Sequence, residues 1–71
     1  MIYIHDIIDR FGGLERFSEV TGVNKHTARW WTYRAKGIPQ RWQSRLLDIA
    51  KHQGVSLTAE EVVNARARDQ K

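Results

Sequence analysis

The basic and aromatic residues of this sequence gather in one stretch, residues 24 to 45. Residues 1–23 hold two basic and four acidic residues, and residues 46–71 hold four of each, so the whole positive excess lies between them. The stretch contains Lys25, Arg29, Arg34, Lys36, Arg41 and Arg45, no acidic residue, all three tryptophans, Tyr33 and His26. A basic band with interleaved aromatic rings indicates a nucleic-acid-binding surface. An ordinary solvated basic surface above buried tryptophans is the alternative on composition alone.

Helical spacing divides the first half of this stretch into two sides. Asn24 is a favoured N-cap residue, and a helix is expected to run from Lys25 to about Ala35. At about 100° per residue, Ala28, Trp31 and Ala35 fall on one side, which predicts that this side faces the core. The opposite side carries His26, Arg29, Trp30 and Tyr33, with Lys25 at its margin.

The residue types on the exposed side suit the base edges and phosphates of DNA. An arginine such as Arg29 can donate two hydrogen bonds to guanine O6 and N7, and an aromatic ring can cover sugars and methyl groups. We expect base contacts from Asn24, Lys25, His26, Arg29 and Trp30. Contacts with the DNA backbone, which position a protein without specifying a sequence, are expected from Tyr33, Arg34, Lys36, Gln40, Arg41 and Arg45.

Two further helices are expected before residue 24. Apolar residues at helical spacing predict a helix from about Tyr3 to Phe11, ended by Gly12-Gly13. A short helix follows from Leu14 and stops at Thr21-Gly22. Gly22 suits the positive φ of a tight turn, and Val23 supplies an apolar residue beneath it.

Two more helices are expected after residue 37. Pro39 suits the first position of a helix that runs to Gly54, because a missing N–H costs nothing there. Thr58 and Glu61 have the spacing of a capping box, with Leu57 and Val62 placed for a hydrophobic staple, and predict a fifth helix.

These signals together predict an all-α, compact bundle of about five short helices. With 71 residues, the chain supports one domain, expected over residues 1–64, followed by a polar, flexible tail over residues 65–71. The second and third helices, joined by a glycine-containing turn, have the pattern of a helix-turn-helix whose second helix enters the major groove.

The sequence also resembles a known family over about Asp6 to Val62, nearly the whole folded part. The resemblance is carried by Phe11-Gly12-Gly13, Gly22-Val23, Thr27-Ala28, Trp31 and Gly37-Ile38-Pro39 with Trp42. These residues are similar to those of short phage and prophage regulators of the lambda repressor and Cro type. The resemblance implies a five-helix bundle that binds an operator in double-stranded DNA, commonly as a homodimer, and regulates transcription, here as a Cro-like repressor.

Three positions depart from the family pattern. Thr21 stands where an aliphatic residue is usual and Ser18 where alanine is commonest, which predicts somewhat looser packing of the second helix. Glu15 replaces the polar amide that often holds a phosphate. For the dimer interface, we expect the apolar residues Leu47, Leu57, Val62 and Val63.

Other classes of protein fit the sequence less well. The chain has no cysteine, and its histidines, His5, His26 and His52, lie far apart without paired acidic residues, so we expect neither an enzyme nor a metal, cofactor or small-molecule site. No apolar run approaches the length that crosses a bilayer, so we expect no membrane partner and a cytoplasmic location. The serious alternative is a protein-interaction module, an antirepressor or adaptor with the same fold; RNA binding is more distant.

Overall fold

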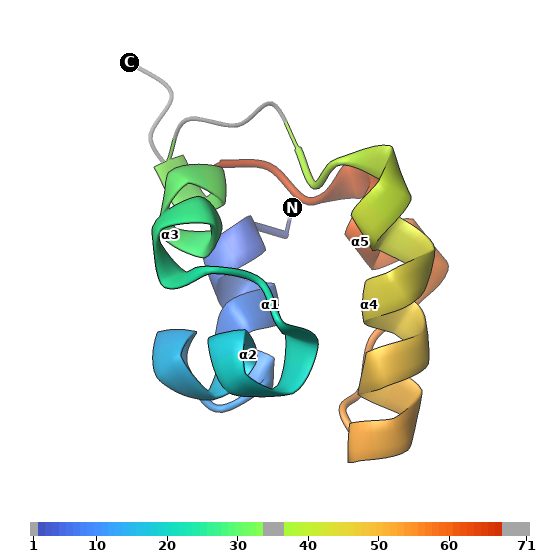
Figure 1. Cartoon of the computed structure of the whole chain (residues 1–71). Helices are drawn as coiled ribbons and strands as arrows, with labels where there is room; N and C mark the ends of the chain where they lie inside the picture. Colours follow the sequence, from blue (N-terminus) through green and yellow to red (C-terminus); the bar gives the residue numbers. More distant parts are fainter. Residues whose placement is uncertain (1, 34–36, 68–71) are drawn as a thin grey trace.

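The computed structural model describes residues 2–33 and 37–67, and in this part of the chain every regular element is a helix (Figure 1). The all-α architecture expected from the sequence is confirmed. Helices α1, α2 and α3 lie together on the left of the view, and α4 and α5 lie on the right. The helices are α1 (Ile4–Arg10), α2 (Leu14–Thr21), α3 (Lys25–Tyr33), α4 (Gln40–Gln53) and α5 (Ala59–Asn64).

An aromatic row through the core joins four segments of the chain. The ring centroids of Phe11 and Phe17 are 5.2 Å apart, those of Phe17 and Trp31 6.4 Å, and those of Trp31 and Trp42 6.0 Å. Each pair meets edge to face, the arrangement that aromatic quadrupoles favour. Trp31 is 2% exposed, which confirms its expected place in the core. This row therefore fixes α3 against α2 on one side and α4 on the other.

Helix α4 begins one residue later than expected. Pro39 has φ −53° and ψ 141°, so its backbone is extended and it occupies the N-cap position instead of the first helical position. Its carbonyl oxygen accepts a hydrogen bond from the Trp42 N–H at 2.9 Å. At the other end the expected stop is confirmed, since Gly54 adopts a left-handed conformation at φ +72° and its N–H donates to the last carbonyls of the helix.

Helix α5 has the capping box that its sequence predicts. The Glu61 N–H donates to the Thr58 hydroxyl, and the Thr58 N–H donates to the Glu61 carboxylate at 3.0 Å. The same carboxylate accepts two hydrogen bonds from the guanidinium of Arg10, at 2.8 and 2.9 Å. Arg10 also donates to the Ser56 carbonyl oxygen at 3.0 Å, so the end of α1 is joined to the start of α5.

The start of the expected tail differs from the structure. Ala65 and Ala67 are buried, at 0% and 1% exposure. The backbone of Arg66 lies beside Tyr3, where its N–H donates to the Ile2 carbonyl oxygen and its carbonyl oxygen accepts from the Ile4 N–H. Figure 1 shows this segment crossing back from α5 toward α1. Residues 65–67 thus belong to the folded body, and residues 68–71 lie outside the described part.

Trp31→Ala is expected to lower the free energy of unfolding by about 3 to 5 kcal/mol, because it removes a buried ring from the centre of the aromatic row. Trp30→Ala is the matched control: the adjacent tryptophan is 52% exposed, and its loss should change stability by no more than about 0.5 kcal/mol. Urea unfolding followed by circular dichroism measures both. Equal destabilisation by the two variants would contradict the assigned rotation of α3.

The Arg10–Glu61 pair should make stability depend on acid pH. Hydrogen bonds from Arg10, and next from the Thr58 backbone, lower the pKa of Glu61 from its ordinary value of 4.5 to about 2. A carboxylate whose pKa is lower in the folded state contributes its full stabilisation above about pH 4.5 and loses it as the pH falls toward 2.

Glu61→Gln is the variant for this test, since glutamine keeps the capping geometry but does not titrate. Urea midpoints of both proteins are measured at pH 6 and pH 3. We expect the parent protein to lose more stability between the two pH values than the variant does. Equal losses would mean that other carboxylates cause the acid sensitivity.

Candidate nucleic-acid interface

A turn of three residues, Gly22 to Asn24, sets the angle between α2 and α3. Gly22 has φ +81°, a conformation that costs L-residues energy, and its N–H donates to the Ser18 carbonyl oxygen at 2.9 Å. Val23 is 2% exposed beneath the turn. Asn24 caps α3 as predicted, because its Oδ1 accepts the His26 N–H at 2.7 Å. Hydrogen bonds thus hold the turn at its first residue, Gly22, and at its last, Asn24.

The hydroxyl groups of α2 make hydrogen bonds with this turn. Thr21 Oγ1 donates to the Phe17 carbonyl oxygen at 2.6 Å and accepts from the Val23 N–H at 3.1 Å. Ser18 Oγ donates to the Val23 carbonyl oxygen at 2.6 Å. Both backbone polar groups of Val23 are therefore satisfied by side chains of α2, which a buried turn residue requires. These bonds were missed in the sequence analysis because Ser18 and Thr21 were considered only for their packing.

The two sides of α3 separate as helical phase predicts. Ala28 and Trp31 are buried, at 0% and 2% exposure. All five residues expected to contact bases are exposed: Asn24, Lys25, His26, Arg29 and Trp30. The contrast is clearest at the two neighbouring tryptophans, since Trp30 is 52% exposed and Trp31 is buried. The described part of α3 thus presents cations, an imidazole and an indole ring to solvent. Ala35 and the side chain of Tyr33 lie outside the described part.

An acidic residue of α2 stands beside the first residue of α3. The Glu15 carboxylate lies 3.6 Å from the Lys25 ammonium, and both side chains are more than half exposed. An exposed pair of this kind contributes little to stability and is weakened by salt, so Lys25 can leave it at small cost. The charge of Glu15 opposes a phosphate at this point of the surface.

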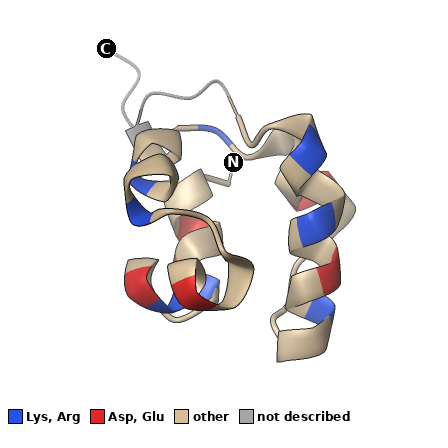
Figure 2. Ribbon diagram, viewed as in Figure 1, with Lys and Arg blue, Asp and Glu red and all other residues tan. Residues whose placement is uncertain are grey.

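The expected backbone-contacting residues are divided between two helices. Figure 2 shows Lys and Arg on α3 and along α4, on opposite sides of the view. Gln40, Arg41 and Arg45 are exposed on α4. The Arg45 guanidinium carbon lies 5.2 Å from the centre of the Trp42 ring, a cation–π contact. Since Trp42 in turn packs on Trp31, Arg45 is connected to the buried side of α3. Arg34 and Lys36 lie outside the described residues.

The expected dimer residues have different surroundings. Val62 is fully buried in the core, so it is not available to a partner and its expected place in the interface is wrong; the fifth helix turns this side chain inward. Leu47 and Leu57 are half-buried and pack against the core. Val63 is 55% exposed.

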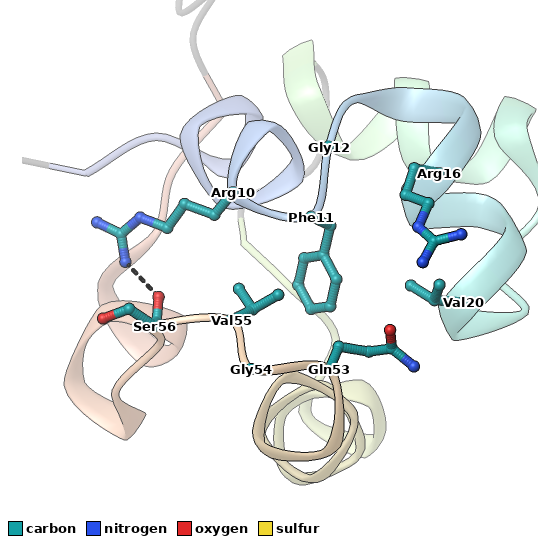
Figure 3. A pocket seen from close by; sticks show the side chains of 9 residues that line it. All are labelled: Arg10, Phe11, Gly12, Arg16, Val20, Gln53, Gly54, Val55 and Ser56. Atoms are coloured by element: carbon teal, nitrogen blue, oxygen red, sulfur yellow. Dashed lines mark hydrogen bonds between the residues drawn. The ribbon is translucent and has the colours of Figure 1, made fainter.

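The structure also contains a groove that the sequence analysis did not predict. It has a volume of about 500 Å³ and lies where the end of α1 and the face of α2 meet the end of α4 (Figure 3). Its lining is Arg10, Phe11, Gly12, Arg16, Val20, Gln53, Gly54, Val55 and Ser56, none of which we expected to contact DNA. The segments that form it are distant in sequence, and no local motif marks them.

The described part of the chain contains neither a metal-binding cluster nor a membrane-spanning helix. No group of three His, Asp or Glu side chains there could hold a metal ion. Over the same residues, no helix combines the length and apolar character needed to span a membrane.

Comparison with known proteins yielded no relative: no protein-family model, no curated protein and no solved structure matches the chain. The candidate interface is therefore defined by the geometry of α2, α3 and α4 alone.

Proposed function

We propose that this chain binds double-stranded DNA in a sequence-specific manner by placing α3 in the major groove, and that it acts in the cytoplasm as a Cro-like repressor of transcription. The observation that carries the proposal is that α3 has one buried side and one exposed side. Behind a closed three-residue turn, Ala28 and Trp31 hold the helix to the core while Arg29 and Trp30 face solvent. A helix is about 10 to 12 Å wide with its side chains, and the major groove is about 12 Å wide.

Each exposed residue type has a use against DNA in this arrangement. Arg29 donates two hydrogen bonds to a guanine, and Lys25 and His26 approach base edges or phosphates from the first turn of α3. Trp30 covers a sugar or a thymine methyl group with its ring. Arg41, Arg45 and Gln40 contact phosphates from α4, which raises affinity without reading sequence.

A protein-interaction module is the second candidate, and Trp30 is the observation that favours it. A half-exposed tryptophan beside an arginine is the composition of many interface hot spots. Salt separates the two functions. Binding to DNA weakens steeply with salt because phosphate contacts release counterions, whereas docking through Trp30 onto a protein depends much less on salt.

Two arginine variants test whether α3 contacts bases and α4 contacts phosphates. Arg29→Ala should weaken binding to the best site by about 1 to 3 kcal/mol and relax the preference at one base pair. Arg41→Ala should weaken specific and non-specific binding alike and lower the salt slope by about one unit. Fluorescence anisotropy with a duplex selected from a random pool, at several salt concentrations, measures both effects. The assignment of Arg29 as a reader fails if its loss leaves the sequence preference unchanged.

We further propose that the chain binds its operator as a homodimer, because one short helix reads only a few base pairs. Val63 supports this, since it and Trp30 are the large apolar side chains of the described part that stay mainly exposed. A two-fold dimer would place two α3 helices about 34 Å apart, in successive major grooves of a palindromic site.

Val63→Asp should reduce cooperative operator binding and leave the monomer folded. Asn64→Asp is the matched control, since it adds the same charge at the next exposed position of α5. Analytical ultracentrifugation of the protein–duplex complex gives the stoichiometry for all three proteins. A parent protein that binds its best duplex one-to-one, well above its dissociation constant, would refute the dimer.

A further inference from the structure

The exposed side of α3 can be compared with the four kinds of base edge that the major groove presents. Guanine offers two acceptors, adenine one acceptor and one donor, cytosine one donor, and thymine an acceptor and a methyl group. A specific contact needs a side chain with the complementary groups in the right arrangement. Guanidinium groups suit guanine, side-chain amides suit adenine, and carboxylates suit cytosine.

The described part of α3 and its N-cap contain a single side-chain amide, that of Asn24, and this amide already has a structural role. Its Oδ1 accepts the His26 N–H at 2.7 Å, while its backbone carbonyl oxygen accepts the Ala28 N–H at 2.9 Å. A bidentate contact with adenine needs the same Oδ1 to accept from adenine N6 while the NH₂ group donates to N7. Oδ1 has a second lone pair, but the cap holds the amide against the His26 N–H, so the amide cannot turn toward a base without giving up the hydrogen bond that starts the helix.

The remaining polar groups on this side are mainly donors. Arg29 is exposed and carries only donors, in the fork that matches guanine O6 and N7. Lys25 adds three more donors at the first turn. Residues 24–33 contain no carboxylate that could accept from cytosine N4.

We infer that α3 selects guanine through Arg29 and makes no bidentate contact with adenine, so that the operator half-site is specified by guanine. This inference rests on the proposed function and names the base that the interface reads. In this role Asn24 is a capping residue, which changes the expectation that it contacts a base.

The test uses a duplex selected from a random pool and resynthesised with one modified base at a time. Substitution of 7-deazaguanine removes the N7 acceptor but keeps base pairing and all phosphates. We expect one guanine in each half-site whose modification weakens binding about fivefold or more, which corresponds to the lower end of a base contact. The Arg29→Ala variant should bind the modified and unmodified duplexes equally. Substitution of 7-deazaadenine at each adenine should change binding less than about twofold, well below the range for a base contact.

Asn24→Ser provides a second, independent measurement. Serine is an equally good N-cap residue but has no amide, so this variant should keep the parent's affinity and selected sequence. A shift in the selected sequence at an adenine, or sensitivity to 7-deazaadenine that Asn24→Ser abolishes, would overturn the inference and leave the proposed DNA binding intact. Selection that enriches no sequence, with binding indifferent to salt, would instead overturn the proposed function and the inference with it.

Discussion

The burial of Trp31 determines the rotation of α3 about its own axis, and the candidate interface depends on that rotation. Successive residues of a helix point about 100° apart, so fixing Trp31 inward also fixes where Arg29 and Trp30 point. The indole ring is held on two sides, by Phe17 of α2 and by Trp42 of α4. A small domain that reads a groove with one helix needs this kind of constraint, because a side chain displaced by one ångström loses its hydrogen bond to a base edge.

The turn before α3 supplies a second constraint, because it sets the direction of the α3 axis relative to α2. Gly22 allows the backbone to reverse, Val23 anchors it in the core, and Thr21 and Ser18 satisfy the polar groups that the anchoring buries. The hydroxyl groups of Ser18 and Thr21 thus supply the hydrogen bonds that the backbone of Val23 needs where the chain passes from α2 to α3.

The helices, their caps and the buried side of α3 were predictable from the sequence because they depend on neighbours within one or two turns. Asn24, Gly54 and the pair Thr58 and Glu61 each act on groups no more than four residues away. The features that the sequence did not predict are long-range. Arg10 meets Glu61 across 51 residues, and residues 65–67 pack beside residues 2–4, so neither has a local pattern. Val62 illustrates the same limit: its helix was predicted, but which side of α5 faces α4 follows from tertiary packing.

Within the candidate interface, the residues that would select a base lie on α3, and the arginines that would attract any duplex lie on α4. The burial of Trp31 determines which side of α3 is exposed. The bases that this side could recognise depend on the hydrogen-bond donors and acceptors that are not used by the N-cap. The arginines of α4 lie on a different helix, and one of them, Arg45, is connected to α3 through Trp42 and Trp31. Under the proposed function, α4 supplies a salt-dependent attraction for any duplex, and α3 adds a contribution that depends on the base.

Glu15 weakens the attraction for any duplex close to α3, since a carboxylate beside Lys25 lowers the local positive potential. A weaker attraction for all duplexes leaves the contribution of Arg29 unchanged, so under the proposed function Glu15 lowers affinity without altering the ratio between specific and non-specific binding.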